Sequence, residues 1–232
     1  MCGRYTIRID WRRIHELYGL TVPLEAEPEG VRARYNAAPG QALPIVGENG
    51  ARRSLLLSRW GLIPPWVARL SEIRISTINA RAETLETSRL YAEPFARRRC
   101  LVPADGWYEW APPAPGEKKK PVDFIAREDG NPFAFAGLWG LWRDERGTIH
   151  VSHTIVTTEA VPALAPLHPR MPVVLDPGDF DEWLRAETAP RHLLRPHGGP
   201  WHHHRVDNRV GKVGEDDAGL LLPIDATDKA VS

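Results

Sequence analysis

The apolar residues of this 232-residue chain come in short runs separated by prolines and glycines, and no long helical stripe occurs. The chain contains 22 prolines, each of which lacks a backbone N–H donor and disfavours the interior of a helix or of a central strand. Short apolar runs between such residues are typical of strands joined by rigid loops. We therefore expect a β-rich fold.

Several segments carry the strand pattern: Cys2–Ile9, Leu43–Val46, Ser54–Trp60, Cys100–Pro103, Trp107–Trp110, Val122–Ala126, Phe133–Trp139 and His150–Thr157. Trp107–Trp110 and Val122–Ala126 flank a loop that is rich in proline and lysine. These two segments are expected to pair as a hairpin.

Three short helices are predicted. Asp10 caps the first, in which Trp11, Ile14 and Tyr18 share one face, and Gly19 ends it. A second lies within Thr84–Arg98. A third starts near Asp179, and Phe180, Trp183 and Leu184 are expected to form its apolar face.

Because strands outnumber helices and do not alternate with them regularly, we predict an α+β fold. It is a single compact domain built on an antiparallel or mixed, barrel-like β-sheet with a few short helices. We assign residues 1–222 to this domain and residues 223–232 to a flexible C-terminal tail.

Thirty basic and thirty acidic residues give a net charge of zero, so any polyanion must be bound by a local patch. No segment approaches the roughly 18 apolar residues that cross a bilayer, and the N-terminus lacks the apolar run of a signal peptide. We expect a cytoplasmic protein that has no membrane partner. The only two cysteines, Cys2 and Cys100, have no metal-ligand spacing and are expected to be reduced thiols.

Cys2 is the first candidate for chemistry, because removal of Met1 would leave a cysteine with both a free α-amine and a thiol. Such a 1,2-aminothiol attacks an aldehyde in two steps, first forming an imine and then closing a five-membered thiazolidine ring. Position alone also fits an ordinary small residue at the start of a strand. By the two-residue strand period, Arg4 and Arg8 are expected on the same face as Cys2, where a cation would lower the pKa of the thiol and hold an anionic substrate. A solvated edge strand is the alternative.

Three further polar residues lie in apolar or turn-forming surroundings: Asn79, Glu109 between two aromatic residues, and His168 before a proline. A carboxyl flanked by aromatic rings has its charged form disfavoured by desolvation, which suits general acid–base work. Histidine titrates near neutral pH. A surface carboxylate and a loop histidine are the alternatives.

Two loops, Arg32–Gln41 and Arg59–Trp66, combine arginine with aromatic residues, glycine and proline. Bases stack on aromatic rings while guanidinium groups hold phosphates, so this composition suits single-stranded nucleic acid. A turn or a part of the core is the alternative for each loop.

The motifs MCGRY, RYNAAPGQ, WGLIPPW, INARAET, RRCLVPADGWYEW, FAFAGLW, TIVTTEA and HPRMPVVL occur in this order along the chain. This series resembles the SRAP family, the SOS response-associated peptidases, which are also described as abasic-site processing proteins. The resemblance runs from Cys2 to about Leu184 and covers most of the chain.

The resemblance implies a sensor of abasic sites in single-stranded DNA that crosslinks itself to the lesion in the DNA damage response. It implies that processed Cys2 forms a thiazolidine with the ring-opened deoxyribose and shields it. Asn79 would orient the reacting groups, and Glu109 and His168 would act as the acid–base pair. We expect no cofactor, no metal and a monomer that associates with the nucleoid when bound to DNA.

The resemblance also implies a set of DNA contacts: Arg4, Arg81 and Arg170 on phosphates, Asn36, Pro39 and Gly40 positioning the strand, and Trp66 as a wedge that stacks on a base. Two departures limit this assignment. A second wedge aromatic is absent after Trp66, and the segment Val206–Gly219 differs from the family pattern, so its contacts with DNA are in doubt.

Other functions stay open. The imine could lose a proton and act as an abasic-site lyase, or the same Cys2, Glu109 and His168 could serve a thiol peptidase, with removal of Met1 as one self-cleavage. A non-covalent single-stranded DNA-binding module is a third hypothesis. The run His202–His204 suggests a transition metal by its imidazoles, but consecutive strand residues point to opposite faces, which favours a solvated or DNA-facing cluster.

Overall fold

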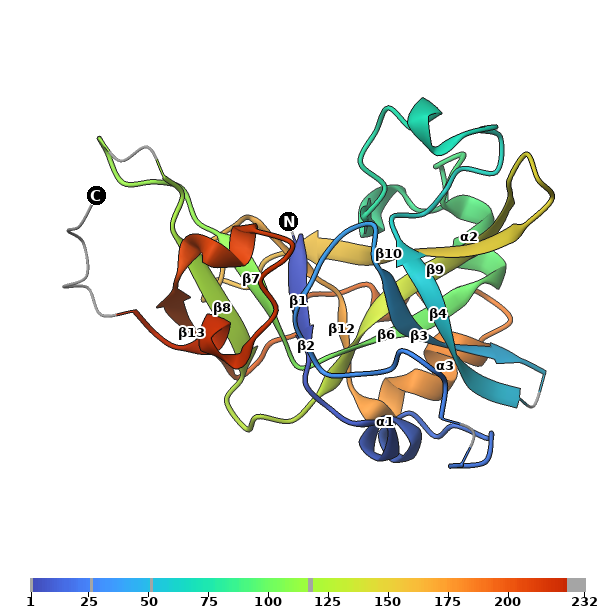
Figure 1. Cartoon of the computed structure of the whole chain (residues 1–232), viewed down its shortest axis with the longest axis horizontal. Coiled ribbons are helices and arrows are strands. Elements are labelled where there is room, and N and C mark those ends of the chain that lie inside the picture. The colour runs from blue at the N-terminus through green and yellow to red at the C-terminus, as the bar shows by residue number, and fades with distance from the viewer. Residues whose placement is uncertain (1, 26, 51, 117–118, 225–232) are drawn as a thin grey trace.

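The computed structural model describes residues 2–25, 27–50, 52–116 and 119–224. Within them, five strands close into a barrel in the order β10–β4–β3–β6–β9, because β9 pairs with both β6 and β10 (Figure 1). The bounds of the barrel strands are Ala42–Asn49 (β3), Arg52–Trp60 (β4), Arg99–Ala104 (β6), Phe133–Arg143 (β9) and Ile149–Glu159 (β10). Closure pairs β9 at one end of the sheet with β10 at the other.

Three short strands extend the barrel sheet: β5 (Asn79–Arg81), β11 (Arg170–Pro172) and β12 (Val174–Leu175). β5 pairs with β10 in parallel, as β4 does, whereas β11 pairs with β10 antiparallel. The sheet is therefore mixed, and the end of β10 lies between β5 and β11.

A second sheet, in the order β13–β8–β7–β1–β2, lies beside the barrel (Figure 1). Its strands are β1 (Arg4–Ile7), β2 (Arg34–Ala37), β7 (Gly106–Trp110), β8 (Val122–Arg127) and β13 (Trp201–Val206). The rings of Tyr5 and Trp107 each contact Phe135 of the barrel edge to face, with centroids 5.7 and 6.1 Å apart. The main core thus fills the space between the second sheet and the barrel.

Three α-helices cover the barrel: α1 (Trp11–Leu17), α2 (Ala92–Arg97) and α3 (Phe180–Arg185). The Asp10 carboxylate accepts from the Arg13 N–H at 2.8 Å, and Gly19 follows α1 with a φ of 61°, as predicted for the first helix. The remaining helical segments are single 3-10 turns: η1 (Leu70–Glu72), η2 (Ala82–Thr84), η3 (Pro177–Asp179), η4 (Arg191–Leu193), η5 (Asn208–Gly211) and η6 (Ala218–Leu221).

The predicted fold class is confirmed, and β7 and β8 form the expected hairpin. The predicted alternation of Cys2–Ile9 is wrong, because β1 begins at Arg4 and its last three residues are all buried. The side chain of Thr6, which would face solvent in an alternating strand, donates to the buried Asp105. Sequence analysis missed β2, β5, β11 and β12, which are strands of two to four residues.

The N–H of Ile224 donates to the carbonyl of Arg205 at 3.0 Å, so the first part of the predicted tail is hydrogen-bonded to β13. The rest of that tail, residues 225–232, lies outside the described residues. No helix in the described part of the chain is long and apolar enough to cross a membrane.

Substitution of Gly137 tests the packing of the barrel. Gly137 of β9 pairs with Cys100 of β6, and a Cβ at Gly137 would lie 2.7 Å from Cys100 Sγ and 2.8 Å from Val102 Cγ2. Gly137→Ala should therefore lower the free energy of unfolding by about 1–3 kcal/mol through overpacking, measured by urea denaturation. Gly178→Ala, where an added Cβ meets no atom within 4 Å, is the control. Equal stability of the two variants would contradict this account.

Candidate active site

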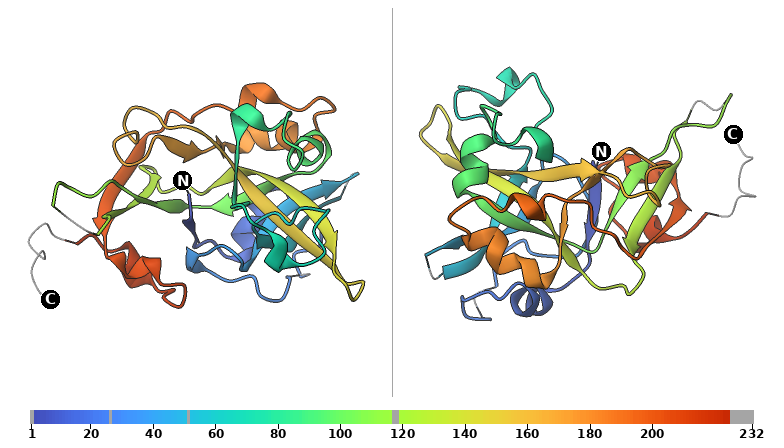
Figure 2. Two further views of the ribbon diagram at one scale, coloured as in Figure 1. Left: turned by 90° about the horizontal axis from the view of Figure 1, so that it is seen from above. Right: turned by 180° about the vertical axis from the view of Figure 1, so that it is seen from behind.

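Cys2 lies just before β1 and is fully buried. β1 runs antiparallel to β7 with Arg4 opposite Tyr108, which brings the start of the chain beside Glu109. The Asn79 side chain donates from Nδ2 to the Cys2 carbonyl at 2.8 Å. The start of β1 is therefore fixed between β7 and β5, and in Figure 2 the blue strand β1 lies in the middle of the molecule.

The environment of the Cys2 thiol is apolar. Burial raises its pKa far above the ordinary value, and the negative charge of Glu109 raises it further. The prediction that a neighbouring arginine lowers this pKa is wrong, because Cys2 precedes β1 and the two-residue period does not reach it. Sγ instead contacts the Arg4 carbonyl at 3.8 Å. A neutral thiol is thus the stable form in the free protein.

Glu109 is buried, with 3% of its surface exposed. The predicted desolvation by Tyr108 and Trp110 is wrong, because these rings pack in a separate cluster on the other face of β7. By strand alternation Glu109 shares its face with Trp107, which belongs to the core that also contains Cys2. Across the hairpin Glu109 lies opposite Asp123, so the core face of this sheet carries two neighbouring carboxyl groups.

Asn79 is held at the edge of the barrel by the parallel pairing of β5 with β10, in which it lies opposite Ile155. The hydroxyl of Tyr91 donates to the Asn79 carbonyl at 3.4 Å. Asn79 Oδ1 is buried and has no hydrogen-bond partner within the described residues. The side chain therefore has a free acceptor beside the main chain of Cys2.

His168 lies in the turn that precedes β11. The backbone N–H of Arg170 donates to its Nδ1 at 3.0 Å. The Arg170 carbonyl lies 3.2 Å from the same nitrogen, but an amide N–H can only donate, so the shorter contact favours the neutral tautomer with its proton on Nε2. His168 thus has an N–H donor on the nitrogen that the turn does not use.

Arg4 and Asn36 are bound to a segment that sequence reasoning did not connect with the site. The Arg4 guanidinium donates at 2.9 Å to each of three acceptors: Asn36 Oδ1 and the carbonyls of Val210 and Gly211. Burial lowers the pKa of this guanidinium. Asn36 Nδ2 donates to the carbonyls of Val210, Lys212 and Glu215 at 3.0, 3.1 and 2.7 Å.

Asp216 is a residue that sequence reasoning missed. Its Oδ1 accepts from the backbone N–H groups of Tyr35 and Asn36 at 2.7 and 2.9 Å, so it holds β2 against the C-terminal segment. No local pattern identifies it, because its partners lie about 180 residues earlier. The segment 206–219, whose role was in doubt, thus supports two of the predicted DNA-binding residues.

The other predicted DNA contacts lie at the surface or form ion pairs. Pro39, Gly40 and Arg81 are exposed. Trp66 is 45% exposed, and the Arg89 guanidinium lies over its ring at 4.3 Å from the centroid. Arg170 makes a bidentate ion pair with Glu83.

The run His202–His204 forms part of β13, and its side chains alternate between the two faces of the sheet. The rings of His202 and His204 stack on one face at 6.1 Å, and His203 Nδ1 lies 3.2 Å from Asp123 Oδ1 on the other. The described residues contain no group of three or more His, Cys, Asp or Glu side chains that could hold a metal ion.

A family model described as SOS response associated peptidase (SRAP) matches residues 1–213. The chain belongs to the SRAP family. Abasic site processing protein YoqW of Bacillus subtilis is 38% identical over 195 residues, which cover 83% of this chain and 84% of YoqW. Abasic site processing protein YedK of Escherichia coli is 34% identical over 236 residues, which cover 97% of this chain and all of YedK.

The SRAP chain also resembles solved structures. A crystal structure of a protein from Bacteroides thetaiotaomicron superposes with a TM-score of 0.85, at 24% sequence identity, over 96% of this chain and 100% of the other. At this identity the likeness bears on the fold alone, and it agrees with the barrel and second sheet described above.

Substitution of Asn36 separates support of the fold from direct binding. Asn36→Ala removes the three hydrogen bonds that Nδ2 donates to the C-terminal segment and the one that Oδ1 accepts from Arg4, so we expect a loss of about 2–3 kcal/mol in the free energy of unfolding. Urea denaturation measures the loss. Asn131→Ala is the control, because Asn131 is exposed and its side chain bonds only to Asp129. A stable Asn36→Ala protein would contradict the supporting role.

The raised pKa of Cys2 predicts slow alkylation. In a Cys100→Ala protein, iodoacetamide should react with Cys2 at a rate that keeps rising with pH wherever the protein stays folded, because the thiolate stays a minor species. In urea the rate should instead level off above the ordinary thiol pKa of about 8.5. Mass spectrometry of the quenched protein gives both rates. A plateau near neutral pH in the folded protein would contradict a buried, neutral thiol.

Proposed function

We propose that this SRAP protein recognises abasic sites in single-stranded DNA and traps the sugar aldehyde with the α-amine and thiol of processed Cys2. The product is a thiazolidine crosslink that shields the lesion. The observation that carries the proposal is the position of Cys2, buried beside Glu109 and bound through its carbonyl by Asn79. The names of the relatives, abasic site processing proteins, support the choice of substrate.

The chemistry balances without a redox partner. The amine of Cys2 adds to the C1′ aldehyde to give a carbinolamine, which loses one water to become an imine. The sulfur then bonds to the imine carbon while the nitrogen takes up the thiol proton. One water is released for each crosslink, and Met1 must be removed first, since an acylated nitrogen cannot form the imine. Met1 itself lies outside the described residues.

The proposed roles follow from the hydrogen-bonding capacity of each group. Asn79 Oδ1, buried and without a partner in the described part of the chain, would accept a hydrogen bond from the α-amine and so orient its lone pair. Glu109 would accept and return the protons of the amine and thiol. His168, with its proton on Nε2, would donate a proton to the ring oxygen when the sugar opens and to the hydroxyl that leaves the carbinolamine as water. The neutral thiol makes amine attack the first step and sulfur closure the second.

For DNA we propose contacts that begin at the exposed groups. Arg81 would hold a phosphate, Trp66 would stack on a base with the face that Arg89 leaves open, and the Pro39–Gly40 turn would guide the strand. This surface would be supported by Arg4, Asn36 and Arg170. These side chains already bind other groups of the protein, so they would contact phosphates only through N–H groups that are not used in those bonds. One protein for each lesion suffices, so we propose that it acts as a monomer.

Substitution of Cys2 tests the proposal. Wild-type protein mixed with an abasic single-stranded oligonucleotide should gain the mass of the strand less one water, and should lack Met1, in an intact-mass spectrum. Cys2→Ala should give no stable adduct, whereas Cys100→Ala, the control cysteine, should react like wild type. A stable adduct with Cys2→Ala would contradict the proposal.

The second step has its own test. Cys2→Ser keeps the amine but replaces the sulfur, so the imine should form without closing to a thiazolidine. We expect an adduct that appears only after borohydride reduction, together with more strand cleavage by β-elimination than with wild type. Gel electrophoresis of a labelled strand measures both. Equal binding of intact and abasic strands, with no trapped imine, would instead favour the non-covalent binding module.

A further inference from the structure

Glu83 and Arg170 form a bidentate ion pair beside the candidate site. Arg170 donates from Nη1 to Glu83 Oε1 at 2.7 Å and from Nη2 to Oε2 at 3.0 Å. Nη2 also donates to the Thr157 carbonyl at 2.6 Å. The arginine side chain is 17% exposed and the glutamate side chain 49% exposed. A bidentate pair with one largely buried partner fixes both side chains more strongly than an ordinary surface pair.

This pair joins the two elements that carry proposed catalytic residues. Glu83 lies in η2, immediately after β5, and β5 begins with Asn79. Arg170 begins β11, and its backbone N–H binds Nδ1 of His168. β5 and β11 pair with opposite edges of β10, both at Thr157. The ion pair therefore spans the end of β10 and links β5 to β11.

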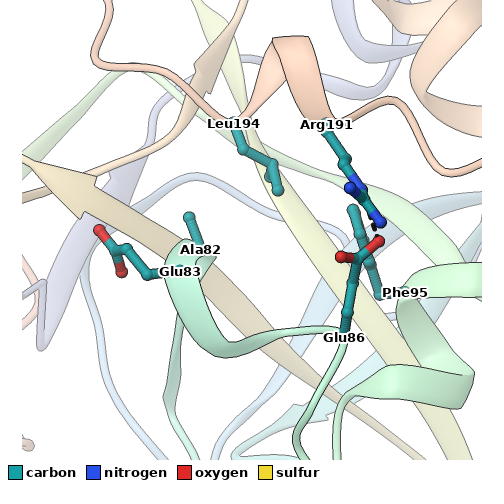
Figure 3. Close-up of a pocket in the computed structure, with 6 residues that line it drawn as sticks. All are labelled: Ala82, Glu83, Glu86, Phe95, Arg191 and Leu194. Carbon is teal, nitrogen blue, oxygen red and sulfur yellow. Dashed lines mark hydrogen bonds and ion pairs between the residues drawn. The ribbon is translucent and has the colours of Figure 1, made fainter.

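The neighbouring Glu86 is oriented differently. Figure 3 shows both carboxylates on the wall of one pocket, with Glu86 directed toward Arg191 and Glu83 directed away from that pair. The Arg191 Nε lies 2.7 Å from Glu86 Oε1, and both side chains are well exposed. The chain thus carries two paired glutamates three residues apart, of which Glu83 is the one bound to the His168 turn.

We infer that Glu83 is a positioning residue: through Arg170 it holds the turn that carries His168 against the strand that carries Asn79. The inference rests on the proposed function, because the geometry matters only if these two residues act on one substrate. In this role Glu83 acts through Arg170 and needs no contact with the substrate. Its loss leaves the Arg170 guanidinium with the Thr157 carbonyl as its main partner, so the first residue of β11 and the bound imidazole can shift. Reactions between fixed groups are sensitive to displacements of about 1 Å.

The test separates the rate of crosslinking from binding. Glu83→Gln should lower the first-order rate of adduct formation at saturating abasic DNA on the order of tenfold. Its affinity for an intact oligonucleotide of the same length, measured by fluorescence anisotropy, should not change. Glu86→Gln removes the same charge three residues away and should match wild type in both measurements. Glu83→Asp, which keeps a carboxylate, should recover part of the rate and provides a second variant if Glu83→Gln folds poorly.

A double-mutant cycle identifies the route of the effect. If Glu83 acts through Arg170, then Glu83→Gln should slow an Arg170→Gln protein no further. Additive losses would overturn the inference. So would a Glu83→Gln protein that crosslinks at the wild-type rate and binds the intact strand more tightly, since Glu83 would then merely mask a phosphate-binding arginine. A wild-type protein that forms no adduct would overturn the proposed function itself, and this inference with it.

Discussion

The hydrogen bond from Asn79 to the Cys2 carbonyl is the contact on which the rest of the site depends. The first residues of a chain are normally poorly ordered unless they are tied down. Here residue 2 is fully buried, and its main chain is bound by a strand that the barrel holds in register. The same position puts its thiol within the field of Glu109. A residue near the start of the chain thus gains the fixed surroundings of a core residue, which the proposed two-step attack by amine and sulfur requires.

Two of the three arginines that were predicted to bind phosphates already bind other residues of the protein. Arg4 binds Asn36 and the C-terminal segment, and Arg170 binds Glu83. With a net charge of zero, the protein has no global field that attracts nucleic acid. If the proposed function holds, this arrangement favours selection by chemistry over selection by affinity, because only an abasic sugar would offer an aldehyde to the amine of processed Cys2.

Local signals predicted a large part of the fold. The cap at Asp10, the stop at Gly19 and the hairpin of β7 and β8 each depend on residues close in sequence, and each formed as expected. The approach of Cys2, Asn79 and Glu109 agrees with the roles that the family resemblance implied, although their chemistry stays a prediction. Periodicity failed where strands are short or covered on both faces, as in β1. It could not identify Asp216 or the Glu83–Arg170 pair, because each joins segments roughly 90 to 180 residues apart and only the folded chain brings them together.

In the proposed crosslink, both the amine and the sulfur of Cys2 bond to one carbon of the abasic sugar. Carbon-13 NMR of the complex formed with a strand labelled at C1′ of the lesion tests it most directly, because the spectrum distinguishes a saturated carbon from a carbonyl or an imine. We expect a single saturated carbon whose signal is split by one-bond coupling when the protein carries nitrogen-15 and is absent with Cys2→Ala. A labelled carbon that stays an imine or a closed sugar hemiacetal in the wild-type complex would contradict it.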